Sequence, residues 1–430
     1  MKTFFIAILL TIYSFTNAQT VLTVDDALKI ALEKNYGILV TRNDAAISRT
    51  NNSFGSAGML PNISLIGNGN YSINDINQKN ADGTKSNISG ATTKSLSTGI
   101  ELSWTIFDGG KMFVTKSKLN EIQALGEIQF KDQILQTQYD VISAYYDIVR
   151  QKQQLNSINE IINYNKELVK ILQTSFDGGS ISKPNLLQAK IDLNVYTENS
   201  INQQYVIDVA KKNLNRILGS TIDFSFEVTD SIPLNYSIDK SELLQKLDDS
   251  NTSILSFQKQ MEIAKLSLKE YTKSRYPLIN FNAGYNLAQN NYSKNSVLQR
   301  NTLGPQFGGS ISIPLYQSGR IQRQISIAKI EVESAEFNLK NIKLQARTDL
   351  LNAITQFENQ QKLRTIEKEN NELTKENLEI SLQRLKQGQT TTLEVHMAQE
   401  NYVQSCTRLI NFEFNLKIAE TKLKQLLALM

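Results

Sequence analysis

The sequence predicts a mainly α-helical fold with a small antiparallel β part, built as two repeated halves that each contain helix, strand, strand, helix and helix. The first observation is a long helical run between Gly110 and Gly178. Apolar residues recur there at every seventh position: Ile134, Val141, Ile148, Leu155, Ile162 and Val169. Such a heptad series indicates a coiled-coil seam. The second observation is that four segments alternate apolar and polar residues with a period of two, as strands do. The third is that the order of elements occurs twice, which indicates duplication of one unit.

The composition excludes several classes of protein. The chain has 430 residues, 40% of them hydrophobic and 20% charged, with a net charge of +4, one Cys and one His. A single Cys and a single His cannot assemble a His/Cys zinc cluster, so we expect no metal or other cofactor. No basic run stands out, and a nucleic-acid partner is not indicated. No convergent set of nucleophile and base residues occurs either, so we do not expect an enzyme.

The N-terminus has the organisation of a secretory signal peptide. An early Lys2 precedes a short apolar core, and small residues at 16–18 suit a cleavage site, so residues 1–18 are the predicted signal peptide. The alternative is a buried N-terminal strand or helix. No later stretch is long and apolar enough for a membrane-crossing helix. We therefore expect either a soluble exported protein or a membrane β-barrel.

The first repeat is predicted over residues 19–225. Helical spacing runs from Leu22 to about Leu60, and strands follow at about 62–73 and 97–107, separated by a polar loop over 74–94. A long helix is predicted over about 110–175. It breaks at a Gly-rich turn over 176–184, and a further helix covers about 185–218.

The second repeat, over residues 226–430, has the same order. A helix over 241–273 precedes strands at about 278–287 and 305–316, with a polar loop over 288–302. A long helix follows over about 319–386, then a turn over 387–392 and a helix over about 393–428. The glycines that bound the two long helices align without a gap: Gly110 and Gly179 in the first half, Gly319 and Gly388 in the second.

The four predicted strands have one apolar face and one face rich in Asn, Ser and Gly, which is typical of membrane-spanning β-strands. Four strands cannot close a barrel, and open edges are not tolerated in lipid, so strands from several chains must combine. Two chains would give a filled barrel and three would give a water-filled one. The polar faces favour three chains, hence a trimeric 12-stranded membrane β-barrel continuous with a long α-helical barrel; the family resemblance given below implies that the membrane is the outer membrane. Tyr71, Trp104 and Tyr285 are candidate membrane-interface aromatics, although ordinary strand packing would also select them.

Two motifs carry a family resemblance. They are Phe107-Asp-Gly-Gly-Lys111, which opens the first long helix, and the turn that begins at Phe176-Asp-Gly-Gly-Ser-Ile-Ser-Lys-Pro184. With their partners in the second half, they make the chain similar to the TolC-like outer-membrane efflux family over its whole mature length. The resemblance implies a homotrimeric exit duct in the outer membrane, in contact with its lipid, with a periplasmic extension. Its implied partners are a periplasmic membrane-fusion adaptor protein and an inner-membrane pump of the RND or ABC type.

The resemblance also assigns residues at the two turns. Gly179, Ser182, Gly388 and Thr391 fall on positions that meet the adaptor in the family. The alternative interpretation is that these residues only reverse the helices, because Gly permits a positive φ and Ser or Thr caps a helix.

The periplasmic gate of the family maps onto the start of the last helix. Glu394 falls on the first acidic position of the constriction, next to Leu393, whereas the second acidic position is Met397. A ring of Glu394 side chains would favour cations. The alternative is a solvated carboxylate on a helix face. The residues that hold the gate closed in the family have no match here, since their positions are occupied by Leu385, Thr390 and Asn185.

The sequence therefore predicts a passive channel of a tripartite efflux or type I secretion system. The competing hypothesis is an exported coiled-coil tether or fibre without a pore. Such a tether would not need strands of membrane-crossing length.

Overall fold

The computed structural model describes residues 21–221 and 225–430, so the predicted signal peptide lies outside the described residues. The chain forms two compact units. One comprises the chain up to Val40, Lys131–Asn251 and Ala346–Met430, and the other comprises Thr41–Phe130 and Thr252–Gln345. The fold is mainly helical with one antiparallel sheet, which confirms the predicted fold class.

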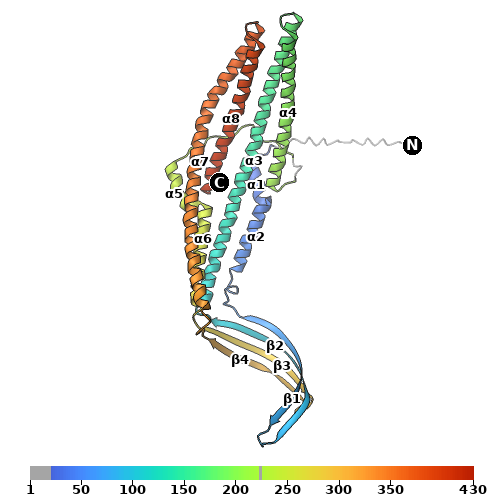
Figure 1. Ribbon diagram of the computed structural model, residues 1–430, viewed down its shortest axis with the longest axis vertical. Helices are drawn as coiled ribbons and strands as arrows, with labels where there is room; N and C mark the ends of the chain where they lie inside the picture. The colour runs from blue at the N-terminus through green and yellow to red at the C-terminus, as the bar shows by residue number, and fades with distance from the viewer. Residues whose placement is uncertain (1–20, 222–224) are drawn as a thin grey trace, which may run out of the picture. The chain divides into compact units, whose positions relative to one another are not determined.

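Four long helices dominate the chain (Figure 1). They are α3 (Lys111–Asp177), α4 (Lys183–Leu218), α7 (Arg320–Lys386) and α8 (Thr392–Leu426). The heptad residues Val141 and Ile148 are fully buried, because they pack with Leu214 and Phe226 in one hydrophobic core. The Tyr145 hydroxyl anchors the N-terminal segment to this core by donating to the carbonyl of Leu22 at 2.8 Å. Among residues 21–221 and 225–430, no helix has both the length and the apolar character needed to cross a bilayer.

The helical segment predicted from Leu22 to about Leu60 is wrong as one continuous helix. It consists of α1 (Val24–Lys34) and α2 (Tyr36–Asn51), followed by a turn-rich connection. Asn35 causes the break, because its side chain accepts from the N–H of Ile38 at 3.1 Å and donates to the carbonyl of Ile217 at 2.7 Å. A short polar side chain that bonds backbone groups competes with the helix in this way.

The helix predicted over 241–273 is divided in the same manner. It consists of α5 (Lys240–Ser250) and α6 (Thr252–Lys273), which meet at Asn251. The Asn251 amide donates to the carbonyl of Leu426 at 2.9 Å, so this break ties the end of α5 to the end of α8.

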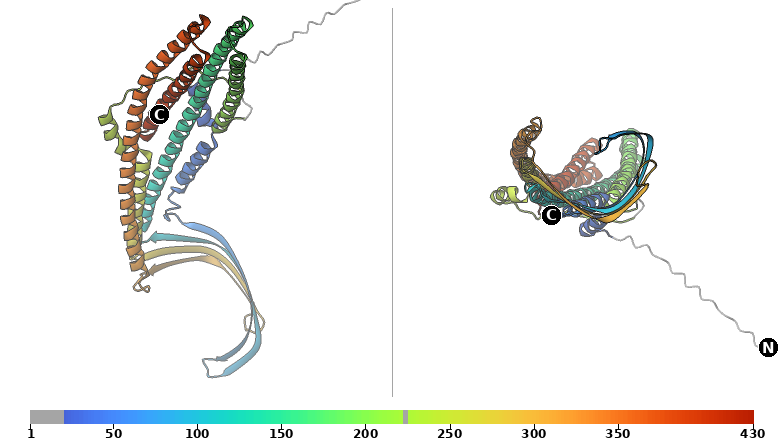
Figure 2. Two further views of the ribbon diagram at one scale, coloured as in Figure 1. Left: turned by 45° about the horizontal axis from the view of Figure 1, so that its top comes forward. Right: turned by 90° about the horizontal axis from the view of Figure 1, so that it is seen from below.

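The sheet has the order β1-β2-β3-β4 and is antiparallel throughout. Its strands are β1 (Asn62–Lys79), β2 (Lys85–Phe107), β3 (Leu278–Tyr292) and β4 (Gln299–Ser312). Figure 2 shows the strands curving strongly along their length. Within the described chain, β1 and β4 each have one edge without a partner strand.

The strands extend well into the segments predicted as polar loops over 74–94 and 288–302. Strand pairing continues to Lys79 and Lys85 in the first hairpin and to Asn291 and Gln299 in the second. The period-two signal disappears there because both faces are polar, although the backbone ladder persists. The fourth strand also ends earlier than predicted, at Ser312 rather than near 316, where Pro314 cannot donate to a ladder.

The register places the apolar residues of all four strands in rows on one face. Ile63 lies opposite Leu102, which lies opposite Ala283, and Phe307 completes the row. The two outer members of this row are exposed in the single chain, Ile63 at 68% and Phe307 at 75%, and the two inner ones are half-buried. The opposite face carries polar rows, such as Ser64, Glu101, Gly284 and Gln306. A continuous exposed apolar face of this kind requires lipid or protein to cover it.

Candidate functional site

The two long hairpins, α3–α4 and α7–α8, end in matching turns. Gly179 and Gly388 adopt φ of +73° and +69°. The N–H of Ser180 bonds the carbonyl of Ser175 at 2.8 Å, and the N–H of Gln389 bonds that of Arg384 at 2.9 Å. Both helices therefore end in the same way, with a glycine in the left-handed conformation and a backbone bond that closes the last turn. A Cβ added to either glycine would meet nothing within 4 Å, so the backbone conformation, not crowding, requires glycine here.

The two candidate hydroxyl residues at the turns have different environments. Thr391 caps α8, because its side chain accepts from the N–H of Glu394 at 3.3 Å. Ser182 occupies the cap position of α4 but makes no side-chain capping bond, and it is exposed. Thr391 therefore has a structural role in the fold of the hairpin, whereas the Ser182 hydroxyl is available to a partner.

The structure brings the three predicted gate residues together on the exposed surface at the start of α8. Leu393 is 65% exposed and Met397 is 59% exposed. Glu394 does not stand free between them. Its carboxylate accepts from the Arg384 guanidinium at 3.2 Å and from the Thr390 hydroxyl in a short contact. The negative charge is thus paired within its own hairpin.

A set of polar links joins the α3–α4 hairpin to the α7–α8 hairpin, and sequence reasoning missed it. Lys386 pairs with Glu167 at 2.5 Å, and Lys375 pairs with Glu160 at 2.9 Å. The Tyr402 hydroxyl also donates to Glu160, at 3.1 Å. The hydrogen bond to Glu160 raises the pKa of the Lys375 ammonium. These partners are far apart in the sequence, and no local pattern could have identified them.

Two further links lie between α4 and α8. The Tyr196 hydroxyl donates to Glu400 at 2.9 Å. Burial, together with the Glu400 carboxylate, raises the pKa of the Tyr196 hydroxyl, so it remains a donor at neutral pH. His396 lies 3.5 Å from Asp192 and lines a cavity of about 350 Å³ between the hairpins. Across residues 21–221 and 225–430, no group of three His, Cys, Asp or Glu side chains is arranged to hold a metal ion.

The three candidate interface aromatics lie on the apolar face of the sheet, in separate rows. Tyr71 lies in the row of Lys94, whose ammonium is 5.8 Å from the ring centroid. Trp104 lies toward the helical end of the sheet, and its indole N–H donates to the carbonyl of Met59 at 2.9 Å. Tyr285 lies in a row between the two, so the structure does not bring the three rings together.

The sequence matches the family described as outer membrane efflux protein over residues 27–220 and 243–429. No curated protein matches it by sequence.

Solved structures share the fold at low sequence identity. CusC is a protein whose structures concern folding and transmembrane channel formation. It is 17% identical, with a TM-score of 0.77 over 94% of this chain and 91% of that chain. VceC of Vibrio cholerae is 16% identical, with a TM-score of 0.76 over 94% and 95%. The CmeC outer membrane channel of Campylobacter jejuni is 16% identical, with a TM-score of 0.78 over 94% and 85%.

Proposed function

The chain belongs to the outer membrane efflux protein family, and on this premise we propose that it is the exit duct of a tripartite efflux or type I secretion system. The family consists of outer membrane channels with a periplasmic extension, not of enzymes. In the proposed system, an inner-membrane pump of the RND or ABC type and a periplasmic adaptor deliver substrates, and the duct conducts them passively.

The observation that carries the proposal is the four-stranded sheet with an exposed apolar face and two open edges. Exposed residues such as Leu65, at 77%, and Phe307, at 75%, suit contact with lipid chains. The open edges of β1 and β4 would leave backbone groups unpaired in lipid, which costs several kcal/mol for each group. Pairing β4 of one chain with β1 of the next satisfies both edges, and three chains close a 12-stranded barrel around the polar faces.

The hairpin turns support a docking role for the opposite end of the duct. Gly179 and Gly388 have open space around them, and the Ser182 hydroxyl makes no capping bond. Both features suit close approach of a partner's helices. Thr391 stabilises the second turn by capping α8. Leu393, Glu394 and Met397 are then the proposed gate, restrained by the links between the two hairpins.

Single-channel recording in a planar bilayer tests the proposal, combined with the mass of the purified protein in detergent. We expect stepwise conductance and a mass of three chains. A monomeric mass without conductance steps would support the competing hypothesis of an exported tether. Conductance from a dimer would retain the channel and overturn the trimer.

A further inference from the structure

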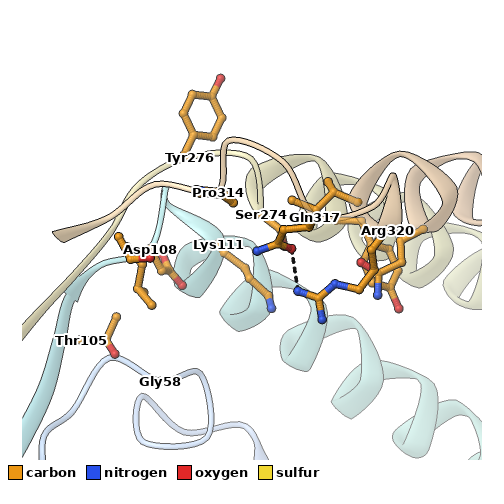
Figure 3. Close-up of a pocket in the computed structure, with 14 residues that line it drawn as sticks. Gly58, Thr105, Asp108, Lys111, Ser274, Tyr276, Pro314, Gln317 and Arg320 are labelled. Carbon is orange, nitrogen blue, oxygen red and sulfur yellow. Dashed lines mark hydrogen bonds between the residues drawn. The ribbon is translucent and has the colours of Figure 1, made fainter. Parts of the chain in front are cut away.

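A polar cavity of about 510 Å³ lies where the sheet meets the starts of α3 and α7 (Figure 3). Thr105, Leu278 and Ser312 line it from the ends of three strands, and Lys111 and Arg320 line it from the first residues of the two helices. Its volume falls within the range of small-molecule sites. All of these residues belong to one compact unit.

Two cations enter this cavity without an acidic partner. Figure 3 shows Lys111 and Arg320 extending into the same space. In the described part of the chain, neither has a carboxylate within ion-pair distance, and the Arg320 guanidinium donates to the neutral side-chain oxygen of Gln317 at 2.6 Å. Both side chains are exposed in the single chain, and two like charges that face one recess attract anions more strongly than either cation would alone.

One acidic residue, Asp108, also lines the cavity, and one of its two carboxylate oxygens binds the N-terminus of a helix. Its Oδ2 atom accepts from the backbone N–H of Met112 at 2.8 Å, at the N-terminus of α3. Helix N-termini carry a partial positive charge that offsets such a carboxylate. The first turns of α3 and α7 contain no acidic residue. The cavity therefore keeps a net positive charge.

The cavity opens on the polar side of the sheet. Thr105 donates to Asn280 across β2 and β3 at 2.9 Å, and it lies on the same face of β2 as Glu101 and Ser103, opposite the apolar face. In the proposed trimer this face lines the lumen. Each chain then contributes two unpaired cations to one level of the duct. Glu101 contributes one carboxylate farther along the sheet, four residues from Thr105 on the same face of β2.

We propose that Lys111 and Arg320 form a basic collar that gives the duct its preference for anionic small solutes, carrying carboxylate or phosphate groups. The inference rests on the proposed channel function. The charges at the hairpin turns do not oppose it, since Glu394 is paired with Arg384. The collar then presents two cations without ion-pair partners from each chain to a passing solute.

The reversal potential of single channels in a KCl gradient tests the collar. We expect the unmodified protein to favour chloride and the double variant Lys111→Gln, Arg320→Gln to shift toward potassium, with a change in the sign of the potential. The charge-conserving double variant Lys111→Arg, Arg320→Lys is expected to keep the anion preference. Lys273→Gln is the matched control, because Lys273 lies 5.1 Å from the Tyr276 ring and does not line the cavity.

Current block identifies the class of anion. Citrate and inorganic pyrophosphate are each added to the bath, and we expect at least one of them to reduce the current in the unmodified protein but not in the Gln double variant. Block by citrate alone assigns carboxylates, and block by pyrophosphate alone assigns phosphates. Channels that conduct, but whose selectivity and block are the same in the Gln variant, overturn the collar. Absence of any conductance overturns the proposed function instead.

Discussion

At the scale of single residues, Glu394 shows how a neighbouring cation neutralises a charge that the sequence suggests is unpaired. The family resemblance suggests a ring of carboxylates that attracts cations. In the structure, the Arg384 guanidinium lies 3.2 Å from that carboxylate, with both side chains about half exposed. An exposed pair of this kind contributes little stability, about 0–1 kcal/mol. Its main effect is on the electric field, because it removes the net charge at the proposed gate.

Removing Arg384 should therefore expose the charge of Glu394. We expect Arg384→Gln to shift the selectivity of the channel toward cations, because Glu394 is then unpaired. Glu394→Gln is expected to shift the selectivity toward anions, and the double variant should fall between the two. Reversal potentials in a salt gradient measure all three. If Arg384→Gln leaves the selectivity unchanged, Glu394 is a solvated carboxylate away from the conduction path.

At the scale of elements, the hairpin turns depend on backbone conformation more than on contacts. Gly179 and Gly388 have positive φ angles and empty surroundings, whereas the adjacent Gly178 has an ordinary φ. A side chain in the left-handed region costs about 1–2 kcal/mol because Cβ crowds the following carbonyl. The two neighbouring glycines of the first turn thus have different roles, and a substitution can separate them.

Alanine substitution at the first turn tests this difference. We expect Gly179→Ala to destabilise the turn by about 1 kcal/mol and to increase proteolytic cleavage between residues 176 and 184. Gly178→Ala is the control, because its added Cβ would lie 3.5 Å from the carbonyl of Thr174, an ordinary contact. Limited proteolysis and thermal unfolding by circular dichroism give the measurement. Equal cleavage of the two variants would contradict the conformational explanation.

At the scale of the whole molecule, the two hairpins of one chain are joined by charged and hydroxyl groups. Lys386–Glu167 and Lys375–Glu160 connect α7 to α3, while Tyr196–Glu400 connects α4 to α8. The family resemblance assigns the bonds that hold the gate closed to positions that are Leu385, Thr390 and Asn185 here, and none of them is the residue type that the family has there. We infer that the links between the hairpins supply the restraint instead.

Loss of two links should favour an open duct. Each exposed pair is worth up to about 1 kcal/mol, so we expect Lys375→Gln with Lys386→Gln to raise the open probability by about threefold to tenfold. The control is Lys190→Gln, since Lys190 bonds Gln173 within a single hairpin at 3.2 Å. Single-channel recordings compare open times. An unchanged open probability in the double variant would place the restraint elsewhere.

Much of the fold was predictable because its signals are local. Alternation of side chains identifies the apolar face that includes Ile63, Leu65 and Ile100, and heptad spacing identifies the buried Val141 and Ile148. The extent of the strands was not predictable, because the alternation ends near Ile73 while strand pairing continues to Lys79. The breaks at Asn35 and Asn251 were missed as well, since the carbonyls they bond belong to distant segments.

The sequence by itself determined the fold class, the family and the residue types at each turn, because these depend on neighbouring positions along one chain. The tertiary structure decided which charges are paired. It brings Arg384 to Glu394 and Lys386 to Glu167, and it places Lys111 and Arg320 in one cavity without an ion-pair partner for either. Coulomb energy depends on distance in space and on solvent exposure. A linear pattern specifies neither quantity for residues separated by hundreds of positions.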